Sequence, residues 1–323
     1  MDLRALSLCL AVNLSLAACR SSDAPRAPAA AVPTTRDVRV GSITLHTVSV
    51  GARERPVRWV IHGGPGLDHT YLRPSLDRLG EDGRVVYIDL RGHGRSSAPP
   101  DAEGYVISDA ADDLAALARS GAVGAAPVDV VAHDFGAAVA LSLAARHPEV
   151  VRSLVLVAPL RDAQQVRAVG ARSRDALGAE GWAAVRALTT PQGTLRDPAQ
   201  VGELFRRLGV MWWHRPPSDA ALREMTRGMI YRPEADANFL QAAQRWRAQD
   251  LAPGVRAPTL VVSGDDDRTF LPAEGRALSE LLPHGRFAVV TDAGHLPFAE
   301  QPARFAETLR GFWQSAAGAS QRR

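Results

Sequence analysis

The segment at residues 128–149, VDVVAHDFGAAVALSLAARHPE, constrains the fold more than any other part of the chain. It begins with a continuous apolar run, which is typical of a buried strand. After Gly136 its apolar residues are spaced three and four apart, which is typical of a helix. Asp134 lies at the small-residue turn between the two. The segment therefore predicts a strand, a tight turn and a helix, with Asp134 at the carboxyl end of the strand.

The same alternation of strands and helices extends along most of the chain. Buried or hairpin strands are indicated at 38–51, 57–66, 84–97, 151–159, 258–264 and 286–295. We therefore predict an α/β fold, a mostly parallel sheet flanked by helices. Its core is assigned to residues 37–160 and 251–318. Strand signals vanish in residues 161–250, which are predicted to form a helical cap over the strand ends, where ligands bind in open sheets.

The composition argues against several classes of protein. A chain of 323 residues, 46% of them hydrophobic and 23% charged, can bury a large core. Its net charge of +3 arises from arginines scattered along the sequence rather than from a basic block, so we expect no nucleic-acid partner. No pattern indicates a metal site or a cofactor, and the sequence leaves the oligomeric state open.

The amino terminus resembles a bacterial lipoprotein signal. Residues 1–18 hold an early arginine and an apolar segment, and the LAAC sequence that ends at Cys19 resembles a lipobox, whose cysteine becomes the lipidated first residue. An ordinary cleaved signal and an unprocessed start are the alternatives. Residues 19–36 are predicted to be a flexible tether. The resemblance implies an exported protein of the cell envelope, attached to a membrane by a lipid anchor only. Both cysteines, Cys9 and Cys19, lie here, so the folded domain would have none.

Four motifs beyond this region resemble those of the α/β-hydrolase superfamily, in that family's order of nucleophile, acid and histidine. They are the oxyanion loop HGGPG at 62–66, the elbow AHDFG at 132–136, the acid loop SGDDDRTFLP at 263–272 and the histidine loop DAGHLPF at 292–298. The resemblance covers residues 37–318. It departs from the family's GxSxG elbow at the central position, where Asp134 replaces the serine.

The resemblance also assigns the acid and the base. His295 is the expected base. The family usually places its acid three residues after the glycine that ends the strand, which here selects Asp267. Asp265 and Asp266 are the alternatives, and they would otherwise cap the helix that follows.

An aspartate at the elbow changes the chemistry that this arrangement supports. A carboxylate that attacks an ester or amide gives a high-energy anhydride, whereas attack on a saturated carbon gives an alkyl ester on Asp134. Water activated by His295 can then hydrolyse that ester at the aspartyl carbonyl. The expected oxyanion donors are the backbone N–H groups of Gly64 and Phe135, because glycine permits close approach and Phe135 begins a helix. His62 is expected to order the loop.

Two branches of the superfamily use such an aspartate, the epoxide hydrolases and the haloalkane dehalogenases. Epoxide hydrolases carry an HGxP loop, which residues 62–65 match, whereas dehalogenases usually have a tryptophan at the position of Phe135. We therefore favour epoxide hydrolysis, with halide chemistry as the alternative. Proline iminopeptidases also carry HGGPG, but with a serine elbow. An esterase or peptidase activity and a non-catalytic surface lipoprotein remain further alternatives.

The cap region supplies the expected substrate contacts. Epoxide hydrolases usually protonate the opening oxygen with a pair of cap tyrosines, and this region holds one, Tyr231, as the candidate acid. Trp212, Trp213 and Phe135 are expected to form an apolar pocket for a small hydrophobic substrate. His214 is expected to pack rather than to react.

Overall fold

The computed structural model describes residues 32–320, apart from 54, 190–194 and 196–197. The predicted signal peptide, Cys19 and the predicted tether up to residue 31 lie outside the described residues. Within them, no helix is both long enough and apolar enough to cross a membrane. The first strand begins at Thr34, so the folded core begins before the boundary predicted at residue 37.

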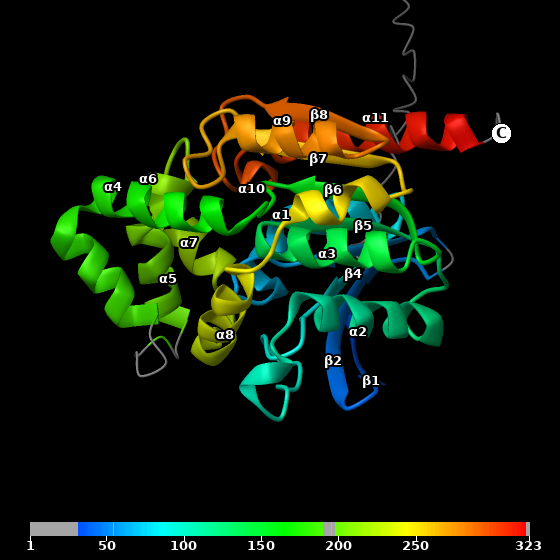
Figure 1. Cartoon of the computed structure of the whole chain (residues 1–323), viewed down its shortest axis with the longest axis horizontal. Coiled ribbons are helices and arrows are strands. Elements are labelled where there is room, and N and C mark those ends of the chain that lie inside the picture. Colours follow the sequence, from blue (N-terminus) through cyan, green and yellow to red (C-terminus); the bar gives the residue numbers. More distant parts are fainter. Residues whose placement is uncertain (1–31, 54, 190–194, 196–197, 321–323) are drawn as a thin grey trace, which may run out of the picture. The chain divides into compact units, whose positions relative to one another are not determined.

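An eight-stranded sheet forms the centre of the fold (Figure 1). Its strands are β1 (Thr34–Val40), β2 (Ile43–Gly51), β3 (Val57–Ile61), β4 (Arg84–Ile88), β5 (Val128–His133), β6 (Val151–Val157), β7 (Thr259–Gly264) and β8 (Gly285–Val290). Their order in the sheet is β1-β2-β4-β3-β5-β6-β7-β8. β2 is antiparallel to β1 and β4, and the other neighbours are parallel. The predicted fold class is confirmed, and the carboxyl ends of β3, β5, β7 and β8 meet at one edge.

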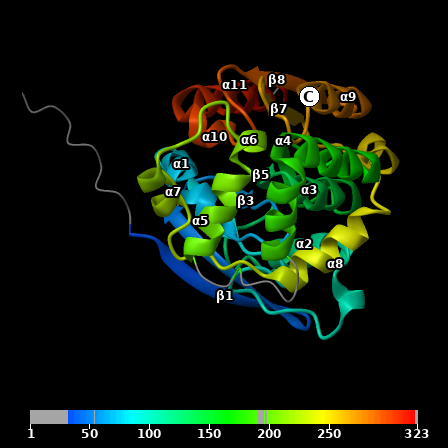
Figure 2. The same cartoon turned by 90° about the vertical axis from the view of Figure 1, so that its left-hand side faces the viewer.

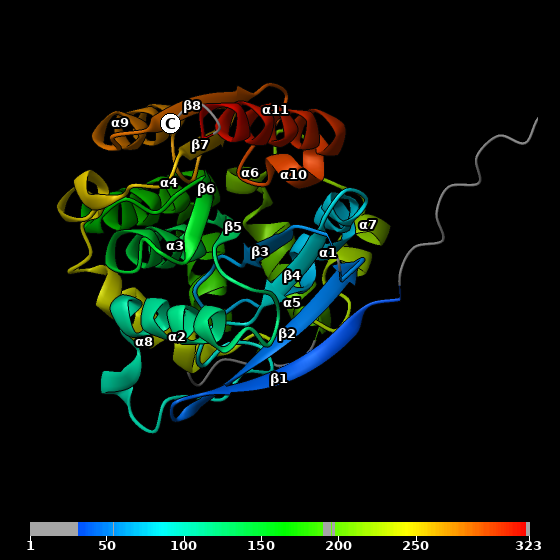
Figure 3. The same cartoon turned by 90° about the vertical axis from the view of Figure 1, so that its right-hand side faces the viewer.

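Helices cover both faces of this sheet. One face carries α2 (Ile107–Ser120), α3 (Phe135–Arg146) and α9 (Pro272–Leu281). The other carries α1 (Arg73–Leu76), α10 (Pro297–Glu300) and α11 (Pro302–Ser320). Leu141 and Leu278 belong to the apolar core on the first face, and Phe298 and Leu309 to the core on the second. Figure 3 shows α2 and α3 on one side of the strands and α1 and α10 on the other.

Between β6 and β7 the chain forms a separate group of helices. They are α4 (Ala163–Thr189), α5 (Pro198–Arg207), α6 (Gly209–Trp212), α7 (Asp219–Met225) and α8 (Pro233–Ala243). Among the described residues of 161–250, the only β-pairing is an isolated bridge between Asp162 and Arg247. Figures 1 and 2 show these helices gathered at one end of the sheet. The segment predicted as a cap is therefore helical, and side chains of α5 and α6 line a cavity with Asp134.

The strand, turn and helix predicted at 128–149 are β5 and α3. All of β5 is buried, as is most of α3, so their apolar sequences match their place inside the protein. Gly136, in the first turn of α3, packs against the HGGPG loop, and a Cβ atom there would lie 2.1 Å from the carbonyl oxygen of His62. The missing side chain lets the elbow and the loop approach each other.

Alanine at Gly136 should therefore destabilise the protein. Its methyl group would overlap the backbone at His62, and overpacking of this kind costs about 1–3 kcal/mol or more. Gly311→Ala is the matched control, because Gly311 is an exposed position in α11 with open space around it. That change should stabilise the protein by about 0.5–1 kcal/mol. Urea unfolding of both variants checks the pair, and equal effects would show that the close approach at Gly136 is not required.

Candidate active site

Asp134 occupies a strained turn between β5 and α3. Its backbone has φ +53° and ψ −121°, a conformation that residues other than glycine rarely adopt. Neighbouring segments hold it there. The Asp134 N–H donates to the carbonyl oxygen of Val157 at 3.0 Å, and the Asp134 carbonyl oxygen accepts from the N–H groups of Ala137 and Leu160. The turn presents the Asp134 side chain to the cavity beneath the cap, as a nucleophile elbow does.

Two backbone N–H groups act on the Asp134 carboxylate. The N–H of Gly64 donates to Oδ2 at 2.9 Å, and the N–H of Phe135 is close enough to help lower the pKa of this carboxyl. Gly64 has φ +127°, which favours glycine and turns its N–H inward from the HGGPG loop. The structure thus brings together the two donors expected from the sequence, and they contact the side chain of Asp134 itself.

His295 and Asp267 form a buried pair at the same cavity. Nδ1 of His295 lies 3.0 Å from Oδ2 of Asp267. The other oxygen of Asp267 accepts from the N–H groups of Thr269 and Phe270 at 2.8 and 2.9 Å. These bonds fix the carboxylate, which in turn fixes the imidazole ring. Nε2 is then the ring nitrogen left for chemistry next to Asp134.

The two neighbouring aspartates are directed elsewhere. Asp266 pairs with Arg268 at 3.0 Å and with His214 at 3.3 Å. Oδ1 of Asp265 accepts from the N–H of Ala293. Of the three aspartates in this loop, Asp267 is therefore the one in contact with the histidine. Within the described ranges, no group of three or more His, Cys, Asp or Glu side chains is arranged to hold a metal ion.

Burial and nearby charges change the ionisation of Asp134 and His295. Burial raises the pKa of Asp134 to about 6, and it outweighs the charge of His295 and the N–H of Gly64, which lower this pKa. Burial lowers the pKa of His295, but the charge and hydrogen bond of Asp267 and the charge of Asp134 outweigh it and raise this pKa above its ordinary value. Near neutral pH the Asp134 carboxyl is mainly ionised, as a nucleophile must be.

A chain of hydrogen bonds that the sequence did not indicate joins the three loops of the site. The Gly63 N–H donates to the Tyr71 hydroxyl oxygen at 2.7 Å, and that hydroxyl donates to Nδ1 of His133 at 2.7 Å. Nε2 of His133 donates to the carbonyl oxygen of His295 at 3.0 Å. Burial and the charge of His295 keep the pKa of His133 well below its ordinary value, so the ring is neutral, with one donor and one acceptor nitrogen. The chain fixes the oxyanion loop, the elbow and the histidine loop relative to one another.

The cavity at Asp134 is small. Its volume is about 10 Å³, roughly the space that one water molecule needs. Tyr71, Phe205, Trp212 and His295 line it together with Asp134. Phe205 lies in α5 and Trp212 ends α6, so any organic substrate requires these cap side chains to move.

The other predicted pocket residues lie elsewhere. Trp213 follows α6 in an extended conformation, with φ −112° and ψ 137°, so its side chain projects away from that of Trp212. It lines a different cavity of about 300 Å³, beside His214. Phe135 is fully buried against Phe239. The expectation that Trp213 and Phe135 line the substrate pocket is therefore corrected, whereas Trp212 lies in the cavity wall.

Tyr231 lies against the oxyanion loop but is directed at another cap residue. Its hydroxyl donates to Oδ2 of Asp236 at 2.7 Å. Both side chains pack on Gly66, where a Cβ atom would lie 2.7 Å from the Tyr231 ring. Burial raises the pKa of Asp236 to about 7, and the charge of Asp134 adds to this shift. Asp236 was not singled out in the sequence, because nothing in its local pattern shows which tertiary contact it makes.

The sheet, the elbow and the His295–Asp267 pair together define a class of hydrolase, and comparison with known proteins agrees. A family model described as the alpha/beta hydrolase fold matches residues 60–302. The chain therefore belongs to the α/β-hydrolase family.

Known proteins similar to this chain differ in their reactions. A pimeloyl-[acyl-carrier protein] methyl ester esterase of Neisseria meningitidis serogroup B is 32% identical over 257 residues, which are 79% of this chain and 91% of the esterase. Epoxide hydrolase 4 of Mus musculus is 31% identical over 124 residues, 37% of this chain and 33% of that protein. The crystal structure of a proline iminopeptidase-related protein from Thermus thermophilus matches with a TM-score of 0.70 and 27% identity, covering 89% of this chain and 99% of that one. These similarities support a hydrolase and leave its substrate open.

Asparagine in place of Asp134 should change how stability depends on pH. A carboxyl group whose pKa is raised on folding, here from 3.8 to about 6, stabilises the folded protein at low pH, and this contribution is lost as the pH rises through about 6. The stability of Asp134→Asn relative to wild type should therefore increase by roughly 1–3 kcal/mol between about pH 4.5 and about pH 7.5. Urea unfolding at the two pH values measures the increase. Asp250→Asn, which changes an exposed carboxylate, is the control. Identical pH dependence in Asp134→Asn and wild type would contradict the raised pKa.

Proposed function

We propose that the protein hydrolyses a small hydrophobic epoxide to a diol through an alkyl ester on Asp134. In this proposal Asp134 is the nucleophile, His295 activates water, and Asp267 orients His295 and stabilises its protonated form. The proposal refines the hydrolase class that the family defines.

The observation that carries the proposal is the position of the oxyanion donors. In acyl transfer by a serine, such donors point at the oxygen of the substrate's carbonyl group. Here the Gly64 N–H donates to Oδ2 of Asp134 at 2.9 Å. If Oδ1 attacks the substrate carbon, Oδ2 becomes the carbonyl oxygen of the new ester and carries the negative charge when water adds. The donors are thus in place for charge that develops on the aspartate.

The first step opens the epoxide. Oδ1 of Asp134 bonds to one ring carbon, the bond from that carbon to the ring oxygen breaks, and the ring oxygen takes a proton. Both candidate hydroxyls are engaged, that of Tyr71 with Nδ1 of His133 and that of Tyr231 with Oδ2 of Asp236, so either must break its hydrogen bond to act as the acid. We assign the proton to Tyr71 because Tyr71 lines the cavity with Asp134. Tyr231, in the cap, is the alternative. The Gly63 N–H, which already donates to the Tyr71 oxygen, stabilises the phenolate.

The second step releases the diol. Nε2 of His295 takes a proton from water as the water oxygen adds to the carbonyl carbon of the Asp134 ester. The tetrahedral intermediate collapses, the diol oxygen leaves with the other water proton, and the carboxylate is restored with one oxygen from water. The proton on His295 then returns to Tyr71. The sum of both steps is addition of one water molecule to one epoxide.

The walls of the cavity favour an apolar substrate. Phe205, Trp212 and Leu67 face the same space as Asp134, and none of them offers a charge to a polar ligand. Trp212 also makes haloalkane hydrolysis the second candidate, because an indole N–H near the nucleophile is a donor that a departing halide requires. Acyl substrates fit less well, since attack by Asp134 would form an anhydride.

The location remains a proposal from the sequence. We propose that Cys19 is lipidated and that the protein is an exported lipoprotein of the cell envelope. The tether predicted at residues 19–36 would then join the anchor to the enzyme.

Glutamine in place of His295 should trap the intermediate. The first step does not need His295, so His295→Gln incubated with styrene oxide should gain the mass of one whole epoxide on the peptide that carries Asp134. With 1-bromohexane the gain would be the hexyl group, since bromide leaves. Mass spectrometry of the digested protein locates the adduct.

The double variant Asp134→Asn/His295→Gln is the control and should gain no mass. Turnover of 4-nitrophenyl butyrate by wild type, with no adduct from styrene oxide or 1-bromohexane in His295→Gln, would show an acyl hydrolase instead and refute the proposal.

A further inference from the structure

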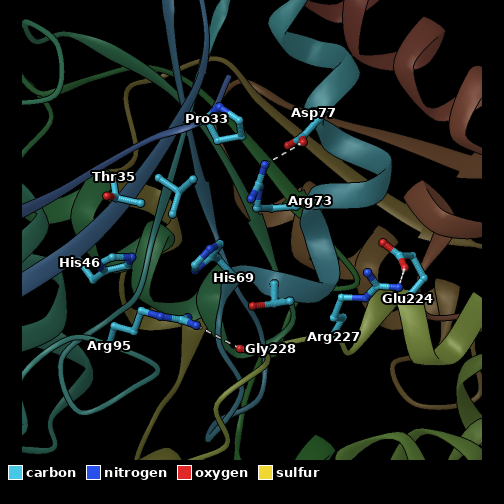
Figure 4. Close-up of a pocket in the computed structure, with 12 residues that line it drawn as sticks. Pro33, Thr35, His46, His69, Arg73, Asp77, Arg95, Glu224, Arg227 and Gly228 are labelled. Carbon is cyan, nitrogen blue, oxygen red and sulfur yellow. Dashed lines mark hydrogen bonds and ion pairs between the residues drawn. The ribbon is translucent and has the colours of Figure 1, made fainter. Parts of the chain in front are cut away.

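A second and larger cavity lies apart from Asp134 (Figure 4). Its volume is about 500 Å³, within the range of roughly 300–1,000 Å³ that is usual for small-molecule sites. Its walls come from β1, β2, the segment after the HGGPG loop, the loop after β4 and the end of α7. It shares no lining residue with the cavity at Asp134. The cavity is therefore a separate place where a ligand fits.

The walls of this cavity are rich in cationic side chains. The charged and titratable lining residues are Arg73, Arg95, Arg227, His46 and His69, against the two carboxylates Asp77 and Glu224. Figure 4 shows Arg73, His69 and Arg95 around the same hollow. Glu224, in α7, pairs with Arg227, which lies just after this helix, and both side chains are exposed at the rim of the cavity. Each of the other four also lies beside a carboxylate: Arg73 beside Asp77, Arg95 beside Asp68, His69 beside Asp89 and His46 beside Asp37. What the cavity offers an anion is therefore oriented N–H groups rather than an excess of positive charge.

Arg73 is held from behind by a carboxylate. Its Nη2 donates to Oδ2 of Asp77 at 3.1 Å. The other oxygen of Asp77 accepts from the Tyr87 hydroxyl at 2.7 Å. Because one edge of the guanidinium is fixed in this way, its other N–H groups are oriented without a further loss of side-chain freedom.

His69 has the same kind of support. Its Nδ1 donates to Oδ1 of the fully buried Asp89 at 2.7 Å, and Oδ2 of Asp89 accepts from the N–H of Arg95. Burial lowers the pKa of His69, but the hydrogen bond and charge of Asp89 and the charge of Asp68 outweigh it and raise this pKa. With Nδ1 committed to Asp89, the ring presents Nε2–H to the cavity that it lines.

Arg95 is the third oriented cation. Its Nη2 donates to the carbonyl oxygen of Gly228 at 3.1 Å, and Nη1 lies 3.6 Å from Oδ2 of Asp68. That oxygen of Asp68 also accepts from the N–H of Ile230 at 2.8 Å. Arg95 and Asp68 together connect the core to the segment between α7 and α8. A ligand on Arg95 would therefore contact the joint between core and cap.

We propose that this cavity binds a phosphate group, held by the side chains of Arg73, His69 and Arg95. Three oriented donors, two from the segment after the HGGPG loop and one from the loop after β4, suit a tetrahedral oxyanion with several acceptor oxygens better than a planar carboxylate. The phosphate can belong to a soluble phosphate monoester or to a lipid headgroup, since both present the same oxygens. This site is independent of the reaction at Asp134.

Thermal unfolding of the full chain in inorganic phosphate tests the proposal. Phosphate at about 10 mM should raise the midpoint by about 2–4 °C over sodium chloride of equal ionic strength, because it binds the folded state. Glycerol 3-phosphate should act in the same way. Sedimentation with phosphatidylcholine vesicles, with and without phosphatidic acid, tells a lipid headgroup from a soluble ligand.

Arg73→Gln should weaken phosphate binding about tenfold or more, measured by calorimetric titration. Arg146→Gln is the matched control, since Arg146 also pairs with an aspartate, Asp112, but lies on α3 outside the cavity. Arg95→Gln, which removes the second guanidinium of the proposed site, provides a second test if Arg73→Gln does not fold, and it should also weaken binding. The proposal fails if neither phosphate nor phosphatidic acid binds wild type beyond the chloride control, or if Arg146→Gln weakens binding as much as Arg73→Gln.

Discussion

The hydrogen bond from the Gly64 N–H to the Asp134 carboxylate is the interaction on which the rest of the site depends. Two glycines make it possible. A Cβ atom at Gly63 would lie 2.8 Å from that of Asp134, and one at Gly136 would meet the carbonyl oxygen of His62. The strained turn at Asp134 then completes the approach from the other side. The hydrogen bond between the oxyanion loop and the carboxylate thus depends on close packing at the two glycines and on the strained turn at Asp134.

The closed cap gives that contact its strength. Burial raises the pKa of Asp134, so the folded protein holds a carboxylate in surroundings that disfavour its charge. The Gly64 N–H and the nearby His295 offset part of this cost. Backbone donors that are already in place also stabilise a developing oxyanion more effectively in a dry site than in water. The same enclosure means that the side chains of Phe205 and Trp212 must move to admit an organic substrate.

Local pattern was enough to predict the α/β fold class, whereas the motifs and their order came from the resemblance to α/β-hydrolases. Local features can be seen directly in the sequence. They include the apolar run of β5, the spacing of apolar residues in α3 and the glycines of residues 62–66. The sequence also placed His295, Asp267 and Gly64 in loops at one edge of the sheet, where the structure shows them. The contacts between the side chains of those loops depend on tertiary packing, which the sequence does not show.

The contacts that the sequence did not predict depend on how side chains pack in the folded protein. Tyr71 and His133 are far apart in the chain, and their hydrogen bond depends on how the segment after β3 packs against β5. Trp212 and Trp213 are adjacent tryptophans that the sequence does not distinguish. Because α6 ends at Trp212 and Trp213 is extended, the Trp212 side chain lines the Asp134 cavity and that of Trp213 points away from it. The Tyr231 hydroxyl donates to Asp236, five residues further along the chain, because a buried hydroxyl needs an acceptor.

A single turnover in heavy-oxygen water tests the central claim most directly. With wild-type protein in excess over styrene oxide, water attacks the carbonyl carbon of the Asp134 ester, so one heavy oxygen should remain in the Asp134 carboxylate and the diol should carry none. Mass spectrometry of the peptide and of the diol measures both. Heavy oxygen in the diol, with an unlabelled Asp134 peptide, would mean that water attacks the substrate directly, and this would contradict an alkyl ester on Asp134.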